Sequence, residues 1–480
     1  MLLTKLIKNI KIEKIRGDIS KVEIFSLCQN INNVKPNSLF FCYKGVNNDG
    51  HLFACKAKQK GAIALIVENF IENIDLPQIL VKNTRKIMPT ICNMFFNNIL
   101  KKIKLIGITG TNGKTTTSCL IYNILKVNKF KVGLIGTNGC FYKNKKIKLN
   151  LTTPDTVDLF YIINDMVKDN IEYVVMEVSA HAIALNKLFG IKFEIMALTN
   201  ITQDHLDFFK TMHKYVITKM KVFNKKFCKV CIVNNDDKYG QLFTKIIKNK
   251  VVTYSLNNPA DNFAIDIKLS KNGSSFVCNI FDQIFNISTK MLGIFNVYNI
   301  LLSLVVCKYL GLSNKNILFG VKNLKQVDGR MNLYNLKNGA VVVIDFAHTP
   351  DGLKNVLVTL QSLKQKGKLT CVFGCGGNRD KLKRDLMGKI AIENADKVYI
   401  TSDNPRFENK FDIINDIVKN LKSKTYYIVE DRKEAINQAI LNSKNEDIIL
   451  IAGKGAEKYQ EINGKKYKYS DKEVIKPYLI

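Results

Sequence analysis

Ten residues, 107–116, join an apolar run at 103–108 to a stretch with helical periodicity that begins at Thr115. They read Gly-Ile-Thr-Gly-Thr-Asn-Gly-Lys-Thr-Thr. A glycine-rich turn between a strand and a helix presents backbone N–H groups and a helix N-terminus, which together favour phosphate. The strict nucleotide-loop pattern expects glycine at position 108, where this chain has isoleucine, but the Gly-Lys-Thr ending is intact. The segment therefore predicts a P-loop in which Lys114 binds the β- and γ-phosphates and Thr115 contacts Mg²⁺.

Further apolar runs follow the loop in a rhythm that predicts a parallel sheet. Runs at 173–176, 195–198 and 230–233 are each followed by polar residues. Because ligands of open α/β sheets bind at the carboxyl ends of the strands, those polar residues are candidates for a site. A second series of strand-like runs, separated by helical stretches, lies at 341–344, 369–373, 397–401 and 448–452. Alternating strands and helices of this kind are typical of α/β domains.

The length of the chain and its pattern of apolar runs and turns predict an α/β protein with three domains. The chain has 480 residues, more than one hydrophobic core usually serves. We expect a small N-terminal α/β domain at 1–102 and a central P-loop ATPase domain with a parallel sheet at 103–328. A Rossmann-like C-terminal domain is expected at 329–480, beside the segment Asp328-Gly329-Arg330.

The net charge of +32 arises from 73 lysines and arginines against 41 acidic residues. Such a charge would ordinarily indicate a nucleic acid or an anionic surface as partner. The lysines are instead dispersed among Asn, Ile, Phe and Tyr, without an arginine cluster or a basic stripe carrying aromatic residues. We therefore expect no nucleic-acid partner, and a phosphate-bearing acidic substrate accounts for only a small part of the charge.

The chain shows no signal for a membrane or for disulfides. No run approaches the roughly 18 apolar residues that a membrane span needs, and residues 1–14 are too charged for a secretory signal. The twelve cysteines are scattered, several within apolar runs, which favours reduced and buried thiols. Cys228 and Cys231 form one C-x-x-C pair, but no second pair lies at zinc-site spacing. We expect a cytoplasmic protein without a membrane span.

Four segments beyond the loop have the order and approximate spacing of the central domain of Mur ligases. They are 152–155 (Thr-Thr-Pro-Asp), 176–181 (Met-Glu-Val-Ser-Ala-His), 199–207 (Thr-Asn-Ile-Thr-Gln-Asp-His-Leu-Asp) and 215–219 (Tyr-Val-Ile-Thr-Lys). The Thr-Gly-Thr-Asn-Gly-Lys-Thr-Thr form of the loop is likewise found in Mur ligases and in folylpolyglutamate synthetases. The chain therefore resembles the Mur ligase family, which implies an ATP-dependent enzyme that forms an amide bond in peptidoglycan precursor synthesis.

The resemblance implies a Mg²⁺ site at the strand ends. Its ligands would be Thr115, Glu177, His205 and Lys219, with Lys219 carbamylated. Carbamylation replaces the positive charge of the amine with a carboxylate-like group, which suits a hard cation. Lys114, Lys219, His205 and Glu177 are the expected catalytic residues.

ATP is expected between the central and C-terminal domains. Segments 293–299 and 328–331 resemble the family's adenine-contacting element and hinge, and 345–351 (Asp-Phe-Ala-His-Thr-Pro-Asp) resembles an ATP-placing element. An arginine at the hinge suits phosphate, because its planar guanidinium forms two parallel hydrogen bonds. The expected ATP-binding residues are Gly110, Thr111, Asn112, Gly113, Lys114, Thr115, Thr116, Asn296, Asn299, Arg330, Asp345 and His348.

The C-terminal segments resemble those of the diaminopimelate-adding members of the family. The tetrapeptide at 403–406, Asp-Asn-Pro-Arg, carries this distinction, since lysine-adding relatives usually lack its arginine. The distal end of meso-diaminopimelate has both a carboxylate and an ammonium, so Arg406 would bind the carboxylate and Glu457 the ammonium. The expected pocket residues are Arg379, Asn404, Arg406, Gly453 and Glu457.

The UDP-N-acetylmuramoyl-dipeptide substrate implied by the resemblance would contact Thr152, Thr153, Ser179 and Lys187. Several positions depart from the family pattern. Lys187 replaces the usual arginine, Leu185 a polar residue and Ala456 a histidine, and Asn30-Ile31-Asn32 stands in place of Asp-Ser-Arg. Most of these differences concern the uridine-nucleotide and muramoyl sites, and the expected catalytic residues are all present.

The implied reaction is phosphorylation of the D-glutamyl γ-carboxylate of UDP-N-acetylmuramoyl-L-alanyl-D-glutamate by ATP. The amino group of meso-diaminopimelate then attacks the acyl phosphate, with Mg²⁺ as cofactor and the protein acting as a monomer. Three alternatives stay open. The chain could be a lysine-adding Mur ligase, a folylpolyglutamate-type ligase, or a basic protein that binds nucleotides or nucleic acid without catalysis.

Overall fold

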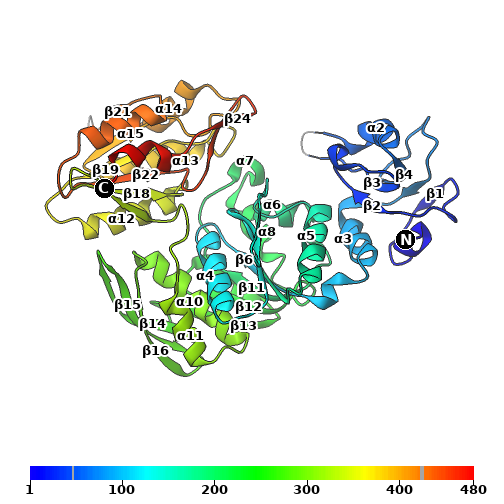
Figure 1. Ribbon diagram of the computed structural model, residues 1–480, viewed down its shortest axis with the longest axis horizontal. Coiled ribbons are helices and arrows are strands. Elements are labelled where there is room, and N and C mark those ends of the chain that lie inside the picture. The colour runs from blue at the N-terminus through cyan, green and yellow to red at the C-terminus, as the bar shows by residue number, and fades with distance from the viewer. Residues whose placement is uncertain (46–47, 422–425) are drawn as a thin grey trace.

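Three lobes, each built around its own β-sheet, follow one another along the chain in the computed structural model (Figure 1). The structure describes residues 1–45, 48–421 and 426–480. The N-terminal lobe and the C-terminal lobe lie at opposite ends of the view, and the central lobe joins them. The α/β fold with three sheet-centred parts is confirmed, whereas the boundaries at 102/103 and 328/329 stay predictions.

The N-terminal sheet has five strands in the order β1-β5-β4-β3-β2. Strands β2 to β5 are parallel to their neighbours, and β1 pairs antiparallel with β5. The strands are β1 (Lys14–Arg16), β2 (Ser26–Cys28), β3 (Ser38–Phe41), β4 (Ala62–Val67) and β5 (Gln78–Leu80), and the helices are α1 (Leu3–Ile7), α2 (Ala54–Gln59) and α3 (Thr84–Phe95). Helix α3 packs against the central lobe, so one hydrophobic core continues from this lobe into the next.

The central sheet has eleven strands in the order β16-β15-β14-β13-β12-β11-β6-β10-β7-β8-β9. They are β6 (Lys104–Thr109), β7 (Val132–Gly136), β8 (Gly139–Tyr142), β9 (Lys145–Ile147), β10 (Tyr173–Glu177), β11 (Phe193–Leu198), β12 (Cys228–Asn234), β13 (Lys250–Ser255), β14 (Asn262–Ser270), β15 (Gly273–Ile280) and β16 (Gln283–Thr289). The strands from β14 to β7 run parallel, as the sequence predicted, and antiparallel strands extend both edges. The continuous apolar runs exist because helices cover both faces of the parallel part.

Eight helices accompany the central sheet within the described residues. They are α4 (Lys114–Val127), α5 (Thr156–Lys168), α6 (Ala180–Ala184), α7 (Leu206–Phe209), α8 (Met212–Met220), α9 (Lys238–Ile246), α10 (Ile294–Tyr309) and α11 (Asn314–Lys322). Helix α10 is apolar on most of its surface and packs against α4, which begins directly after the P-loop. A helix buried in this way holds α4 firmly in place, and so fixes the loop.

The C-terminal sheet has six strands in the order β17-β18-β22-β19-β20-β21, parallel except for β17. The strands are β17 (Asn332–Asn335), β18 (Val341–Asp345), β19 (Leu369–Phe373), β20 (Lys397–Ile400), β21 (Tyr426–Ile428) and β22 (Ile448–Ala452), followed by the hairpin β23 (Tyr459–Ile462) and β24 (Lys465–Lys468). The helices are α12 (Pro350–Leu363), α13 (Leu382–Asn394), α14 (Lys410–Val418), α15 (Arg432–Leu441) and α16 (Asp471–Ile475). All four strand-like runs predicted after position 340 are strands.

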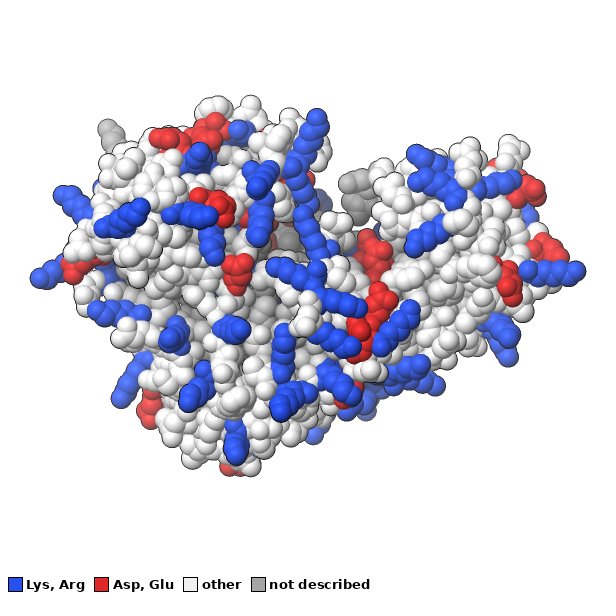
Figure 2. Space-filling view, in the orientation of Figure 1, with Lys and Arg blue, Asp and Glu red and all other residues white. Residues whose placement is uncertain are grey.

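Two further properties of the protein are the distribution of its basic side chains and the apolarity of its helices. Lysine and arginine side chains are spread over all three lobes on the face shown in Figure 2, which matches their dispersal along the sequence. In the part of the chain that the structure describes, none of the helices has the length and apolarity needed to cross a membrane.

A buried ion pair ties the end of the chain to the C-terminal sheet. Arg432, at the start of α15, donates from Nε and Nη2 to the two carboxylate oxygens of Asp471, each at 2.9 Å. The same Nη2 donates to the carbonyl of Ala452 at the end of β22, also at 2.9 Å, and the Tyr469 hydroxyl donates to Asp471. Both charged side chains are 1% exposed or less. Removing one partner would therefore leave the other charge buried and unpaired.

We predict that Asp471→Asn lowers the free energy of unfolding by about 3–5 kcal/mol, the usual cost of breaking a buried ion pair from one side. Urea unfolding followed by circular dichroism would measure it. The matched control is Arg16→Ala, which breaks the exposed Arg16–Glu72 pair and should cost less than about 1 kcal/mol. Equal losses in the two variants would contradict the prediction.

Candidate active site

The P-loop lies between β6 and α4 and rests against the segment that follows β11. Gly110 and Gly113 have positive φ angles, of 150° and 82°. A Cβ atom on Gly110 would lie 1.8 Å from the Thr199 hydroxyl oxygen, so only glycine allows the loop to pass there. Thr199 donates to the Asn112 carbonyl at 2.6 Å, and Asn200 accepts from the Asn112 N–H at 2.9 Å. The strand-end segment of β11 thus supports the predicted nucleotide loop.

Lys114 is held at this loop by two backbone carbonyls. Its Nζ donates to the Gly110 carbonyl at 2.8 Å and to the Thr111 carbonyl at 2.7 Å. Burial lowers the pKa of Lys114, while Glu177 and Asp204 oppose that shift. The two carbonyl contacts hold Nζ against the loop, which is the position from which a P-loop lysine is expected to contact phosphate.

Glu177 joins the loop to the neighbouring strand end. It is 1% exposed, and its Oε2 accepts hydrogen bonds from the Thr115 hydroxyl at 2.9 Å and the Thr137 hydroxyl at 3.1 Å. Its Oε1 accepts the Thr137 N–H at 2.7 Å. Arg330, from the segment between the central and C-terminal sheets, donates to the Thr115 hydroxyl at 3.0 Å. Three predicted residues, Thr115, Glu177 and Arg330, therefore meet at one point.

Lys219 approaches the same loop from α8. Its Nζ donates to the Gly110 carbonyl at 2.9 Å, the oxygen that also accepts Lys114, and lies 3.4 Å from the Thr109 hydroxyl. Lys219 is 1% exposed, and burial together with the nearby Lys114 charge holds its pKa well below the ordinary lysine value. A lysine in this environment favours the neutral amine.

His205 and Asp204 follow Thr199 and Asn200, the two residues after β11 whose side chains bond to the P-loop. His205 has a φ of 58°, and its Nε2 lies 3.2 Å from Asp204 Oδ2. Burial lowers the pKa of His205 to about 3 in spite of the neighbouring Asp204 charge. Burial disfavours the charge of Asp204, but Lys383 and His205 outweigh it and keep the pKa of Asp204 below its ordinary value. His348 Nε2 lies 3.9 Å from the same carboxylate, and burial lowers its pKa to about 4.

The remaining predicted ATP residues divide into two groups. Asn299, on α10, accepts the Thr117 hydroxyl at 3.2 Å and donates to Asn296 at 3.1 Å, beside the loop. Asp345 instead accepts two backbone N–H groups, from Met331 at 2.8 Å and Ala347 at 2.7 Å. Asp345 therefore fixes the connection between the central and C-terminal sheets, and an ATP contact for it stays a prediction.

The predicted muramoyl contacts lie on the other side of Glu177. Thr153 donates to the Glu177 carbonyl at 2.8 Å and to the Ser179 hydroxyl at 3.2 Å, and the Thr152 hydroxyl lies 3.1 Å from that of Thr137. Lys187 is 8% exposed and pairs with Asp155 at 2.6 Å. Thr152, Thr153 and Ser179 thus lie next to Thr137 and Glu177, and their contact with the muramoyl substrate stays a prediction.

The predicted amino-acid pocket is assembled in the C-terminal lobe. Asn404 donates to Glu457 at 3.0 Å, and Lys454, fully buried, donates to both at 2.9 and 3.0 Å. Arg406 donates to the Gly377 carbonyl at 2.7 Å and pairs with Glu461 at 3.2 Å. Arg379 and Arg406 both lie beside Gly376, where a Cβ atom would be 2.9 Å from Arg406 Nη1 and 3.7 Å from Arg379 Cγ. Burial and then the charge of Arg406 lower the pKa of Arg379.

Position 453 requires glycine for its backbone geometry, whereas the predicted contact of Gly453 with the amino acid stays a prediction. Its φ is 113°, and a Cβ there would lie 2.8 Å from Asp403 Oδ2. The backbone can therefore turn closely past the end of β20.

Hydrogen bonds join the C-terminal lobe directly to the P-loop. Asn112 donates to Asp351 at 2.8 Å and accepts the Thr349 hydroxyl at 3.2 Å. Gln203 donates to Asp380 at 3.2 Å. The starts of α12 and α13 in the C-terminal lobe thus contact the P-loop and the segment after β11.

Several side chains of this site were not predicted individually. They are Thr137, Asp155, Asp204, Lys383 and Lys454. Asp155, Asp204 and Lys454 lie within segments that the sequence had already singled out, so their place beside predicted residues was the available signal. Thr137 follows strand β7, and only its position at a strand end could have identified it.

A ready metal site made from protein side chains alone does not occur among the described residues: no three His, Cys, Asp or Glu side chains gather around one point. Glu177 and Thr115 nevertheless provide hard oxygen atoms beside the P-loop, and Lys219 provides an amine that carbamylation would convert to another. Mg²⁺ usually needs only one or two carboxylates in addition to phosphates and waters. The residues present therefore fit Mg²⁺.

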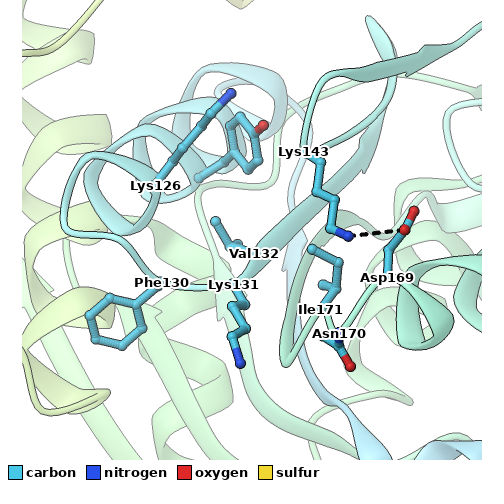
Figure 3. Close-up of a pocket in the computed structure, with 9 residues that line it drawn as sticks. Lys126, Phe130, Lys131, Val132, Lys143, Asp169, Asn170 and Ile171 are labelled. Atoms are coloured by element: carbon cyan, nitrogen blue, oxygen red, sulfur yellow. Dashed lines mark hydrogen bonds and ion pairs between the residues drawn. The ribbon is translucent and has the colours of Figure 1, made fainter.

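A separate hollow of about 350 Å³ lies far from this chemistry, at the opposite end of α4 (Figure 3). It is bordered by Tyr122, Lys126 and Phe130, and by Lys143, which pairs with Asp169 at 3.0 Å. The P-loop is at the other end of the same helix, so the hollow is not part of the candidate site.

Comparison with known proteins assigns the family. The sequence matches the Mur ligase middle domain at residues 108–307 and the Mur ligase glutamate ligase domain at residues 329–455. The chain belongs to the Mur ligase family, whose members are ATP-dependent ligases.

Curated relatives that match this chain over nearly their full length carry one activity in their names, the addition of 2,6-diaminopimelate. The chain is 42% identical to a UDP-N-acetylmuramoyl-L-alanyl-D-glutamate--2,6-diaminopimelate ligase of Clostridium acetobutylicum over 482 residues, covering 100% of this chain and 99% of that protein. A solved structure of a ligase with the same activity in its name has a TM-score of 0.69 and 28% identity, and covers 99% of this chain and 98% of that chain. The MurF ligase of Thermotoga maritima in complex with ADP has a TM-score of 0.65 and 22% identity, covering 90% and 94%, and shares the fold.

We predict that Lys114→Met lowers turnover by at least about 100-fold, because a buried donor at the phosphates has no substitute. Phosphate release at saturating ATP would measure it. Lys126→Met, an exposed lysine at the other end of α4, is the control and should keep normal turnover. Similar losses in both variants would show that the charge of Lys114 is not the cause.

Proposed function

We propose that this protein adds meso-diaminopimelate to UDP-N-acetylmuramoyl-L-alanyl-D-glutamate, with ATP as co-substrate and Mg²⁺ as cofactor. It would act in the cytoplasm and as a monomer. The observation that carries the proposal is the contact of the C-terminal lobe with the P-loop region, where Asn112 donates to Asp351 at 2.8 Å and Gln203 donates to Asp380, next to Arg379, at 3.2 Å. Relatives with about 40% identity over their full length carry this activity in their names, which supports it.

The first step forms an acyl phosphate. The substrate's γ-carboxylate oxygen attacks the γ-phosphorus of ATP, the bond to the bridging oxygen breaks, and ADP leaves with the electron pair. Lys114 and Arg330 lie at the loop and would neutralise negative charge that develops on the phosphoryl oxygens. Bound Mg²⁺ would add to that neutralisation.

The second step forms the amide. The amine of the incoming amino acid attacks the acyl carbon, loses a proton, and phosphate leaves. Asn112 donates to Asp351 at 2.8 Å, and this contact between the lobes would keep the proposed amino-acid site close to the acyl phosphate. Such closure would also keep water away from the acyl phosphate.

The pocket chemistry favours diaminopimelate over lysine. Arg379 and Arg406 provide two guanidinium groups close together, which suits a distal carboxylate. Glu457 offers a carboxylate to the ammonium, although Lys454 and Asn404 share it. Lysine has no distal carboxylate and would leave the arginine pair without an anion.

Phosphate release tests this proposal directly. The protein would be given ATP, Mg²⁺ and UDP-N-acetylmuramoyl-L-alanyl-D-glutamate with meso-diaminopimelate, with L-lysine or with neither. We predict rapid release and a tripeptide product only with diaminopimelate, and a rise of at least about tenfold in its KM in Arg406→Lys, because lysine cannot bind a carboxylate through two parallel bonds. Preference for lysine would overturn the pocket assignment, and release independent of any amino acid would overturn the ligase function.

We also predict that Lys219 is carbamylated. Burial and the nearby Lys114 charge lower the pKa of Lys219 and so favour the neutral amine, which can attack CO₂, over the ammonium, which cannot. Carbon-13 NMR of the protein in labelled bicarbonate should show a carbamate signal that disappears in Lys219→Ala, together with activity. Lys221→Ala, two residues on and exposed, is the control. A Lys219→Ala variant with normal activity would contradict the prediction.

A further inference from the structure

Lys383 is a buried cation at the active-site interface to which the mechanism above gives no role. It lies in the first turn of α13, in the C-terminal lobe, and is 4% exposed. Its Nζ contacts Asp204 Oδ1, on the central lobe, at 3.5 Å. Moving an ammonium group out of water costs several kcal/mol of free energy. Contacts across the interface between the lobes must therefore offset this cost for Lys383.

The ammonium of Lys383 has unused hydrogen-bonding capacity. An ammonium has three N–H donors, and within the described chain Lys383 makes one hydrogen bond, at the outer limit of length. Lys454, also buried in the C-terminal lobe, makes two bonds of 2.9 and 3.0 Å. Lys383 therefore has donors available for a further anion.

Its surroundings indicate which anion. Asp204, the partner of Lys383, is next to His205 and within 3.9 Å of His348. The resemblance to Mur ligases implies that His205 binds the metal and that His348 contacts ATP. The start of α13 is fixed there, because Asp380 accepts the Leu382 N–H at 3.0 Å and the Gln203 side chain at 3.2 Å. The helix N-terminus thus presents Lys383 to the segment that supports the P-loop, where phosphate is expected.

We propose that Lys383 is a further catalytic residue, a cation that the C-terminal lobe contributes to the phosphoryl group during its transfer to the substrate carboxylate, with Asp204 holding it between turnovers. This inference rests on the proposed function. The phosphorus–oxygen bond to ADP breaks and the bond to the carboxylate forms, with no proton consumed, and Lys383 neutralises charge on the non-bridging oxygens.

The test isolates the first step. Diaminopimelate is omitted, and the acyl phosphate is trapped with hydroxylamine as the hydroxamate while ADP formation is followed. Lys383→Met should slow hydroxamate formation by about 100-fold, the usual effect of losing one such donor, while the Kd of ADP and the KM of diaminopimelate stay within about threefold. Lys383→Arg keeps the charge and should retain most of the rate.

Two control variants separate this role from simpler ones. Lys389→Met removes a more exposed lysine of the same helix, paired with Asp385, and should leave the rate unchanged. Gln203→Ala removes a neighbouring bond between the lobes but no charge, and should cost less than about threefold. A purely mechanical role in holding the lobes together would instead make Gln203→Ala and Lys383→Met similar.

Each result decides the question. Normal hydroxamate formation in Lys383→Met, an equal loss in Gln203→Ala, or an equal loss in Lys383→Arg would overturn the inference. Absence of hydroxamate with the unaltered protein would overturn the proposed function and this inference with it, whereas failure of the inference alone would leave the unaltered protein fully active.

Discussion

The carbonyl oxygen of Gly110 is the point on which the site depends, because the side chains of Lys114 and Lys219 both donate to it. Two amines that converge on one neutral oxygen cannot both carry charge cheaply in a buried place. Lys219, more deeply buried, therefore has the strongly lowered pKa, and Lys114 lies at the loop where phosphate is expected. The difference between two chemically identical side chains arises from their environment alone.

The strands place that carbonyl at the carboxyl ends of the central sheet, close to the contact with the C-terminal lobe. It follows β6, at the centre of the parallel part of the sheet, so the ends of β10 and β11 lie on either side. Glu177 comes from one neighbour, and the Thr199 segment supports the loop from the other. The C-terminal lobe then contacts the loop through Asn112. Chemistry that needs groups from several domains is thus concentrated at one strand end.

Whether a feature was predictable from the sequence depends on how far apart in the chain the residues that form it lie. Strands β6, β10, β11 and β12 of the central sheet and β18, β19, β20 and β22 of the C-terminal sheet were predictable, because they are largely buried and read as continuous apolar runs. The loop was predictable because its glycines are a local requirement. The Asp204–Lys383 pair was not, since its partners are separated by 179 positions and meet only when the lobes dock. Likewise β14 to β16, the antiparallel extension, alternate in burial and carry no motif.

Cationic side chains at this interface lack full anionic partners, which costs stability that bound anions would offset. Lys114, Lys383 and Arg330 lie there beside the amine of Lys219, and the nearby carboxylates are Glu177, Asp204 and Asp345. Buried charges without full partners cost free energy, and well-packed apolar residues would serve the fold better. ATP and two carboxylate substrates would supply the missing negative charge. Closure of the lobes therefore becomes more favourable when the substrates are present, which couples assembly of the site to its chemistry.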